Sequence, residues 1–170
     1  DTDRQGTLRD WQTLSSSDID LVTLDTPKAI KSLPNLTSKY DLICLDGAGK
    51  AGLDGVSVEA IKVSDLVIIP LQVGSFDMWG SESVVEACKI RRELCGKPDC
   101  RFVFNRVNSQ TKIFAEGKKI LEHYEIETFE HYVSQRVAFA SLASTGESVM
   151  SKGDPKAYLE IKGLANEIVK

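Results

Sequence analysis

The stretch Tyr40-Asp41-Leu42-Ile43-Cys44-Leu45-Asp46-Gly47-Ala48-Gly49 decides the fold class of this chain. Residues 42–45 form an unbroken apolar run, too short for an independent helix, that ends at an acid followed by two glycines. Such a run is typical of a strand buried on both faces, as in a parallel sheet covered by helices. We expect Asp46 at the C-terminal edge of that sheet, where ligands of open α/β sheets bind. An incidental strand-end aspartate fits this stretch equally well.

Strands and helices are predicted to alternate on both sides of this stretch. The predicted strands are residues 19–24, 42–46, 65–70, 101–105 and 128–133. The predicted helices are residues 7–15, 53–63, 77–94, 109–124 and 137–143, a weak helix from Pro27 that Pro34 interrupts, and a last helix opened by Asp154-Pro155. On the helix over 109–124 we expect Ile113, Ile120, Leu121 and Tyr124 to face inward. This alternation predicts an α/β fold with a mostly parallel, helix-covered sheet.

The composition indicates one ordinary globular domain. The 170 residues are 42% hydrophobic and 27% charged, and no apolar run is long enough to span a membrane. Four cysteines form no C-x-x-C pair, so we expect reduced thiols and neither a zinc site nor disulfides. We find no internal repeat or linker and predict a single domain over residues 1–170.

The net charge of −4 conceals a basic sector. Residues 89–119 hold nine Lys and Arg against three acids, a balance of +6, whereas the rest of the chain carries −10. A basic sector on an acidic protein is one signature of a nucleic-acid surface. The solvated faces of two helices would give the same pattern.

Several segments, taken together and in order, resemble the ParA/MinD group of P-loop ATPases. Asp1-Thr2-Asp3-Arg4-Gln5-Gly6 resembles a D-x-D-x-Q-G segment, and Tyr40-Asp41 with Asp46-Gly47 resembles the Walker B strand. The same holds for residues 65–72 with Phe76-Asp77, and for Gln135-Arg136-Val137-Ala138-Phe139 with Gly146-Glu147-Ser148-Val149. Small ParA-type partition ATPases are the most similar subgroup. The chain differs from many of them in Arg4, where they have Pro, and in Gly47-Ala48-Gly49, where they have Thr-Pro-Pro.

The family's glycine-rich phosphate loop and the strand before it are not found in this sequence. Gly47-Ala48-Gly49-Lys50 lacks the following Ser or Thr that such a loop needs. We therefore expect an N-terminally truncated domain of P-loop type, with a gap in its sheet and poor nucleotide binding as it stands. If the chain is complete, a non-catalytic adaptor or dimerisation module of this fold becomes the favoured interpretation.

The resemblance implies roles for five residues. Asp46 would hold Mg²⁺ through water, Asp1 would join the same metal network, and Asp3 would orient the water that attacks the γ-phosphate of ATP. Asn105 would read adenine, and Arg106 would either stack on the base or face solvent. The Ser134-Gln135-Arg136 loop lies near the base in this architecture.

The resemblance also implies a function. The intact protein would be a Mg²⁺-dependent ATPase that segregates plasmid or chromosomal DNA in the bacterial cytoplasm, on the nucleoid. ATP would close a homodimer that binds DNA without sequence preference, and a centromere-binding partner protein would trigger its release. The candidate DNA-binding residues are Lys89, Arg91, Arg92, Lys118 and Lys119. A MinD-like membrane-cycling ATPase and an ATP-dependent small-molecule ligase are alternatives, but the last helix lacks the basic amphipathic character of a membrane anchor, so no membrane partner is expected.

Overall fold

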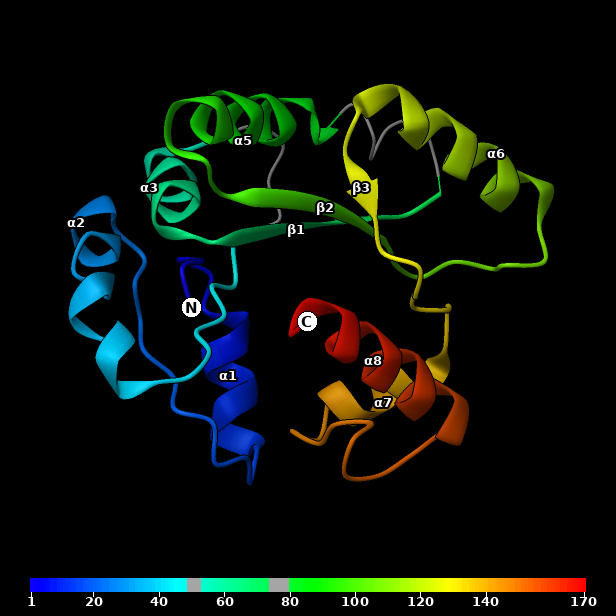
Figure 1. The fold of residues 1–170 in the computed structure, drawn as a ribbon. Coiled ribbons are helices and arrows are strands. Elements are labelled where there is room, and N and C mark those ends of the chain that lie inside the picture. Colours follow the sequence, from blue (N-terminus) through cyan, green and yellow to red (C-terminus); the bar gives the residue numbers. More distant parts are fainter. Residues whose placement is uncertain (49–52, 74–79) are drawn as a thin grey trace. The chain divides into compact units, whose positions relative to one another are not determined.

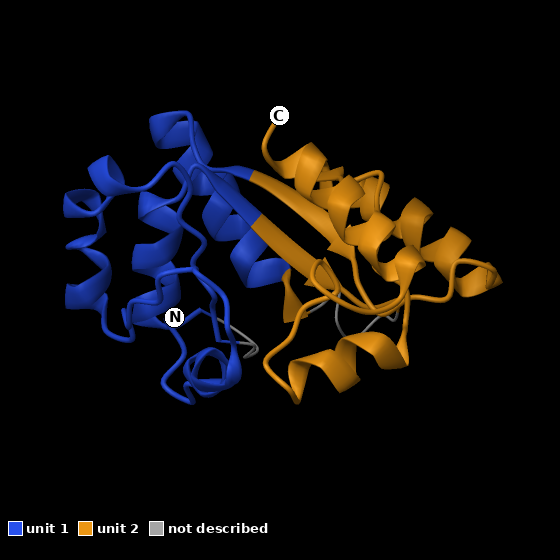
Figure 2. Cartoon of the chain, turned by 90° about the horizontal axis from the view of Figure 1, so that it is seen from below, with its two compact units in different colours: residues 1–67, 82–99 blue, residues 68–81, 100–170 orange. Residues whose placement is uncertain are grey.

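The computed structural model describes residues 1–48, 53–73 and 80–170 (Figure 1). The chain divides into two compact units (Figure 2). Unit 1 comprises residues 1–67 and 82–99, and unit 2 comprises residues 68–81 and 100–170. The single domain over residues 1–170 stays a prediction.

Most helices of unit 1 begin and end close to where the sequence predicts them. The helix predicted over residues 77–94 begins only at Glu82, and residues 77–79 of that prediction lie outside the described residues. The helices of unit 1 are α1 (Thr7–Leu14), α2 (Pro27–Ile30), α3 (Gly55–Val63) and α5 (Glu82–Cys95), with two 3₁₀ turns, η1 (Leu33–Asn35) and η2 (Thr37–Lys39). Asp54 caps α3, because its carboxylate accepts the backbone N–H of Ser57 at 2.8 Å. Pro34 falls in η1, so the chain after α2 continues in 3₁₀ turns, as the interruption of the weak helix predicts.

The extended segment of residues 42–46 corrects the prediction of a strand buried on both faces. Ile43 and Leu45 pack against the core cluster of unit 1 (Leu24, Ile30, Leu33 and Val56). Leu42, however, is 60% exposed, and Cys44 is exposed as well. Within residues 42–46, the backbone hydrogen bonds to described residues are confined to the carbonyl oxygen of Asp46. The segment is therefore not part of a β-ladder. The apolar run reflects a single covered face.

Residues 19–24 also fall short of a full strand. They are extended and meet Asp1 through two backbone hydrogen bonds, but Ile19 is 70% exposed. The alternating pattern therefore marks an extended segment with few partners among the described residues.

The sheet has the order β1 (Leu66–Leu71), β2 (Asp99–Phe104) and β3 (Glu127–Thr128). The backbone N–H of Asp99 donates to Asp65 and that of Asn105 donates to Leu71, both at 2.8 Å and in the same register, so β1 and β2 are parallel. β2 and β3 are parallel too, with Arg101 opposite Glu127. The predicted parallel arrangement is confirmed for these three strands, and Pro70 lies inside β1 instead of ending it.

Unit 2 is built around the aromatic residues of β2. Its helices are α6 (Lys112–Leu121), continued by the 3₁₀ turn η3 (Glu122–Tyr124), then α7 (Val137–Ala143) and α8 (Pro155–Ile168). Phe102 contacts Tyr124 edge to face with ring centroids 5.7 Å apart, and Phe104 contacts Phe114 at 5.1 Å. None of the described helices is both long enough and apolar enough to cross a membrane.

The buried face of α6 agrees with the prediction at Leu121 and differs from it at Ile113 and Ile120. Ile113 and Ile120 are 53% and 48% exposed, whereas Phe114, Gly117 and Leu121 are buried. A Cβ on Gly117 would lie 3.6 Å from the Phe104 ring. The same Cβ would lie 3.2 Å from the Val73 side chain, which is closer than an ordinary contact, so the absence of a side chain at residue 117 avoids crowding on this buried face.

Candidate functional site

Three segments of unit 1 bring the predicted acidic residues together. The backbone N–H and the hydroxyl of Thr2 both donate to the carbonyl oxygen of Asp46, at 2.9 and 2.7 Å. Asp1 joins the same loop to residues 22–24. Its backbone nitrogen donates to the carbonyl oxygen of Val22 at 2.9 Å, and its carbonyl oxygen accepts the N–H of Leu24 at 2.7 Å. The loop of residues 1–6, called the N-terminal loop below, therefore runs beside Asp46.

The Asp1 carboxylate is the most enclosed group of this loop, because its side chain is only 1% exposed. Oδ1 accepts the backbone N–H of Asp3 at 2.9 Å. Oδ2 receives no well-aligned hydrogen bond, and the Nε of Arg9 lies 3.0 Å from it. Asp1 is thus paired with a cation inside unit 1.

Asp3 and Asp46 are more open than Asp1. The Asp3 carboxylate accepts the backbone N–H of Gln5 at 3.0 Å, and its second oxygen has no hydrogen bond to a described residue. Asp46 is exposed, with its carbonyl oxygen held by Thr2. These two carboxylates are the ones that a ligand can reach.

Arg9, in the first turn of α1, is the residue that sequence reasoning missed. The Nη2 of Arg9 donates to the carbonyl oxygen of Asp3 at 2.8 Å and to that of Arg4 at 3.2 Å. The other arm, Nη1, lies 3.7 Å from Asp25 Oδ2. The available sequence signal was the pair of acids Asp1 and Asp3, which favours a cation nearby, and Arg9 follows Asp3 by six residues.

The residues fit Mg²⁺ only in part. Mg²⁺ is bound by few carboxylates and keeps several of its waters, so its ligands must face open space. Asp46 meets this requirement, whereas the enclosed and ion-paired Asp1 does not. Within residues 1–48, 53–73 and 80–170, no cluster of three or more His, Cys, Asp or Glu side chains forms a metal site.

A pocket of about 210 Å³ opens beside the N-terminal loop. It is lined by Thr2, Arg4, Pro27, Asp54, Gly55 and Val56. Arg4 is exposed there, and its Nε lies 3.5 Å from the carbonyl oxygen of Asp25. The guanidinium of Arg4 is therefore a cation in the lining of this pocket, beside the N-terminal loop.

The two residues predicted to contact the base lie in unit 2. Asn105 follows β2, and its backbone N–H donates to Leu71 at 2.8 Å. Arg106 has a positive φ of 54°, and its Nε donates to the side-chain oxygen of Gln135 at 3.2 Å. Val107 and Ser134 form a parallel bridge. The structure thus brings Arg106 next to the Ser134-Gln135-Arg136 loop, and the contact of either with a base stays a prediction.

Glu160 of α8 holds that loop. Its carboxylate accepts the backbone N–H of Ser134 at 3.0 Å and the Ser134 hydroxyl at 2.8 Å, and it pairs with Arg136 Nη2 at 2.6 Å. Asp154 takes the other arm of Arg136 at 3.2 Å. Burial raises the pKa of Glu160, but hydrogen bonds from Arg136 and Ser134 outweigh it and lower that pKa overall.

Glu167, two turns further along α8, holds the residues just before this loop. Its two oxygens accept the backbone N–H groups of Glu130 and His131, each at 2.9 Å, and its carboxylate also contacts the His131 ring. Burial raises the pKa of Glu167, but these hydrogen bonds outweigh it and lower that pKa overall. A Cβ on Gly163 would overlap the His131 ring. Residues 130–136, called the α8-bound segment below, are therefore fixed by two carboxylates of one helix.

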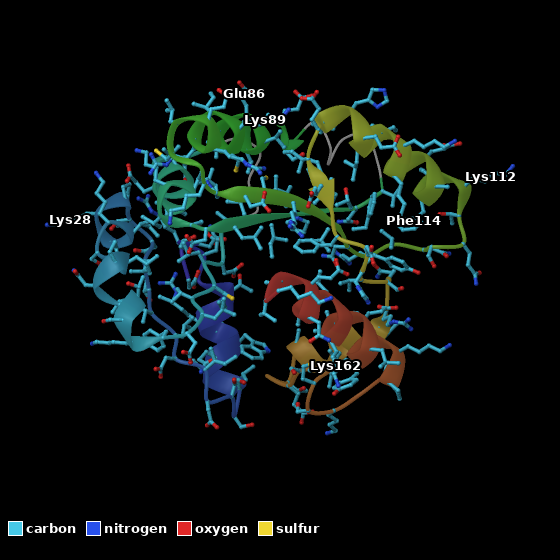
Figure 3. All side chains as sticks on the ribbon, in the orientation of Figure 1. Lys28, Glu86, Lys89, Lys112, Phe114 and Lys162 are labelled. Carbon is cyan, nitrogen blue, oxygen red and sulfur yellow. The ribbon has the colours of Figure 1, made fainter. Side chains whose placement is uncertain are left out.

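The predicted DNA-binding residues fall on two helices in different units. Lys89, Arg91 and Arg92 are on α5 in unit 1, where Figure 3 also labels Glu86. Arg92 pairs with Asp99 at 3.0 Å, so its charge is partly compensated. Lys118 and Lys119 are exposed on α6 in unit 2, and the Nζ of Lys118 lies 5.1 Å from the Phe114 ring centre. Contact of any of these five residues with DNA stays a prediction.

A comparison with known proteins adds one relative. The chain is similar to the maintenance of carboxysome distribution protein A of Halothiobacillus neapolitanus, with 20% identity over 175 residues, covering 99% of this chain and 81% of that protein. No family model matches the chain.

Proposed function

We propose that this chain is part of a ParA/MinD-type ATPase that distributes a cargo within the bacterial cytoplasm. The observation that carries the proposal is the similarity, along 99% of the chain, to a protein named for the maintenance of carboxysome distribution. The grouping of Asp1 and Asp3 beside Asp46 supports it, because those are the positions that match the family's acidic motifs.

The chemistry proposed for the site is phosphoryl transfer from ATP to water. Bound Mg²⁺ would neutralise charge on the phosphates. Asp46 is the residue that fits a water-mediated contact to the metal, because its carboxylate is exposed. Asp3 would hold the attacking water through its open carboxylate oxygen, and Asn105 with Arg106 would contact the base.

For the cargo, we propose plasmid or chromosomal DNA, moved by a nucleotide-dependent homodimer that binds DNA without sequence preference and is released by a centromere-binding partner. The second candidate cargo is a protein compartment, which the name of the relative favours. Both share the same ATP cycle, so the ATP cycle is tested first.

The test is ATP turnover by the full-length protein, with and without duplex DNA. We expect slow turnover that DNA or the partner accelerates, and a loss of about 100-fold in the Asp3→Ala variant. Asp10→Ala is the matched control, because Asp10 is an exposed acid on α1. Equal turnover by the Asp3→Ala variant and the wild type would remove Asp3 from the mechanism, and no turnover by the wild type would reject the ATPase.

DNA binding is tested through the two lysines of α6. Removing two phosphate contacts should weaken binding and reduce the slope of log affinity against log salt by about 2. We expect this for Lys118→Ala with Lys119→Ala, and no change for Lys156→Ala with Lys162→Ala on α8, measured by fluorescence anisotropy at several salt concentrations. An unchanged slope in the α6 variant would exclude this surface.

A further inference from the structure

We infer that Arg9 is the positioning residue of the N-terminal loop, and that Asp1 is its counter-ion and not a magnesium ligand. The consequence for Asp3 rests on the proposed ATPase function. The pairing itself can be tested without nucleotide.

The contacts of Arg9 use three sides of its guanidinium. Nε faces Asp1 at 3.0 Å, Nη2 bonds the carbonyl oxygens of Asp3 and Arg4, and Nη1 faces Asp25 at 3.7 Å. A planar guanidinium offers five N–H donors in fixed directions, which a lysine ammonium does not reproduce. One side chain thus connects the loop to the start of α1.

The sequence of the loop leaves room for this guanidinium. Gly6 has a φ of +72°, and a Cβ at this position would lie 2.7 Å from both Nε and Nη2 of Arg9. Any other residue would have to displace the guanidinium and would strain the backbone. The positive φ of Gly6 thus keeps this position free of a side chain, and the Arg9 guanidinium lies over it.

The Asp1 carboxylate is enclosed by described residues, which disfavours a hydrated metal ion as its partner. Oδ1 is occupied by the N–H of Asp3, Oδ2 faces Arg9, and the side chain is 1% exposed. A second cation at this carboxylate would also meet the repulsion of the guanidinium, which is strong at such short range away from bulk water. The geometry assigns Asp1 to the loop and leaves Asp46 as the accessible acid.

The Asp1–Arg9 pair determines how Asp3 is presented. The N–H of Asp3 is fixed by Asp1 and its carbonyl oxygen by Arg9. With both backbone groups held, the Asp3 carboxylate is oriented by residues that do not touch the substrate. In the full-length ATPase, the loss of either partner should lower kcat by about 10- to 100-fold.

The first experiment is a double-mutant cycle in thermal unfolding of the full-length protein without nucleotide. Arg9→Gln leaves a buried charge unpaired, so we expect the Tm to fall by about 5 °C. In the Asp1→Asn background the same change should lower the Tm by less than about 2 °C. Arg4→Gln, which removes an equal charge from the same loop, should have little effect. Additive shifts for Asp1 and Arg9 would overturn the inference.

The second experiment measures Mn²⁺ binding, as a substitute for Mg²⁺, in the presence of ATP by electron paramagnetic resonance. Asp46→Asn should weaken Mn²⁺ binding about tenfold, and Asp1→Asn should leave it within about twofold of the wild type. Equal weakening by both variants would make Asp1 a ligand and overturn the inference. If the wild type binds no Mn²⁺ with ATP, the proposed function fails, and the Tm cycle alone decides the role of Arg9.

Discussion

The N-terminal loop of unit 1 and the α8-bound segment of unit 2 are held by side chains of opposite charge. In unit 1 a cation of α1, Arg9, binds carbonyl oxygens and carboxylates. In unit 2 two anions of α8, Glu160 and Glu167, bind backbone N–H groups and an arginine. In both cases a helix fixes the loop through charged side chains, which supply stronger hydrogen bonds than neutral groups do.

The two arrangements differ in how much each depends on one residue. The loop around Arg9 is also held by local turns, because the Asp1 and Asp3 carboxylates each accept the backbone N–H two residues later. Gly6 lies against the Arg9 guanidinium. Ser134 depends on Glu160 for both its backbone N–H and its hydroxyl. We therefore expect the α8-bound segment to be the more sensitive to single changes.

The largest effect is expected for Glu160→Ala. This change removes one of the two acidic partners of Arg136 and two hydrogen bonds of Ser134. We expect the free energy of unfolding to fall by about 3 kcal/mol in urea denaturation. Glu116→Ala, an exposed acid on α6, should cost less than about 0.5 kcal/mol. Similar losses for both variants would mean that the α8 contacts do not hold the segment.

An intermediate effect is expected for Gly6→Ala, with Gly96→Ala as its matched control. Both glycines have a positive φ, of 72° and 74°, so both variants pay the cost of a left-handed residue, about 1 kcal/mol. Only Gly6 faces Arg9, whereas a Cβ on Gly96 meets nothing within 4 Å. We expect Gly6→Ala to lose about 2 kcal/mol in the same assay. Equal losses of unfolding free energy in the two variants would show that the position of Arg9 does not depend on the absence of a side chain at residue 6.

The smallest effect is a pH dependence of stability. The pKa of Glu160 is lowered from its usual 4.5 in the folded protein, so the ionised carboxylate stabilises the fold. This contribution is complete above the unfolded-state pKa and is lost as the pH falls through the lowered folded-state pKa. The stability difference between the wild type and Glu160→Gln should therefore shrink between about pH 6 and about pH 3. A difference that stays constant over this range would argue against ionic contacts at Glu160.

The sequence predicts the regular elements better than it predicts their faces. The helix over residues 137–143 matches the structure. The Asp154-Pro155 start of α8 matches too, because cap and proline signals are local. On α6 the prediction was right for Leu121 and wrong for Ile113 and Ile120, because Ile113 and Phe114 are adjacent apolar residues and both can belong to a stripe with helical spacing. The burial of Phe114 and Gly117, which depends on tertiary packing, selects between the two faces.

The candidate site shows the same division. Asp1, Asp3 and Asp46 can be proposed from the sequence because they match short motifs, and in the structure Thr2 joins the N-terminal loop to the backbone of Asp46. Arg9 was missed because its role depends on a positive φ at Gly6, which no periodicity reveals. Glu160 and Glu167 were missed because they are 26 and 36 residues from Ser134 and His131, the residues they bind.

This difference in sequence distance has a consequence for the order of folding. The bonds among Asp1, Asp3, Gln5 and Arg9 join residues two to eight positions apart, and closing such short loops costs little entropy. The α8-bound segment must wait until the last helix of the described chain has been synthesised and has docked. We expect pulse-labelling hydrogen exchange to protect the amide of Asp3 before that of Ser134 during refolding.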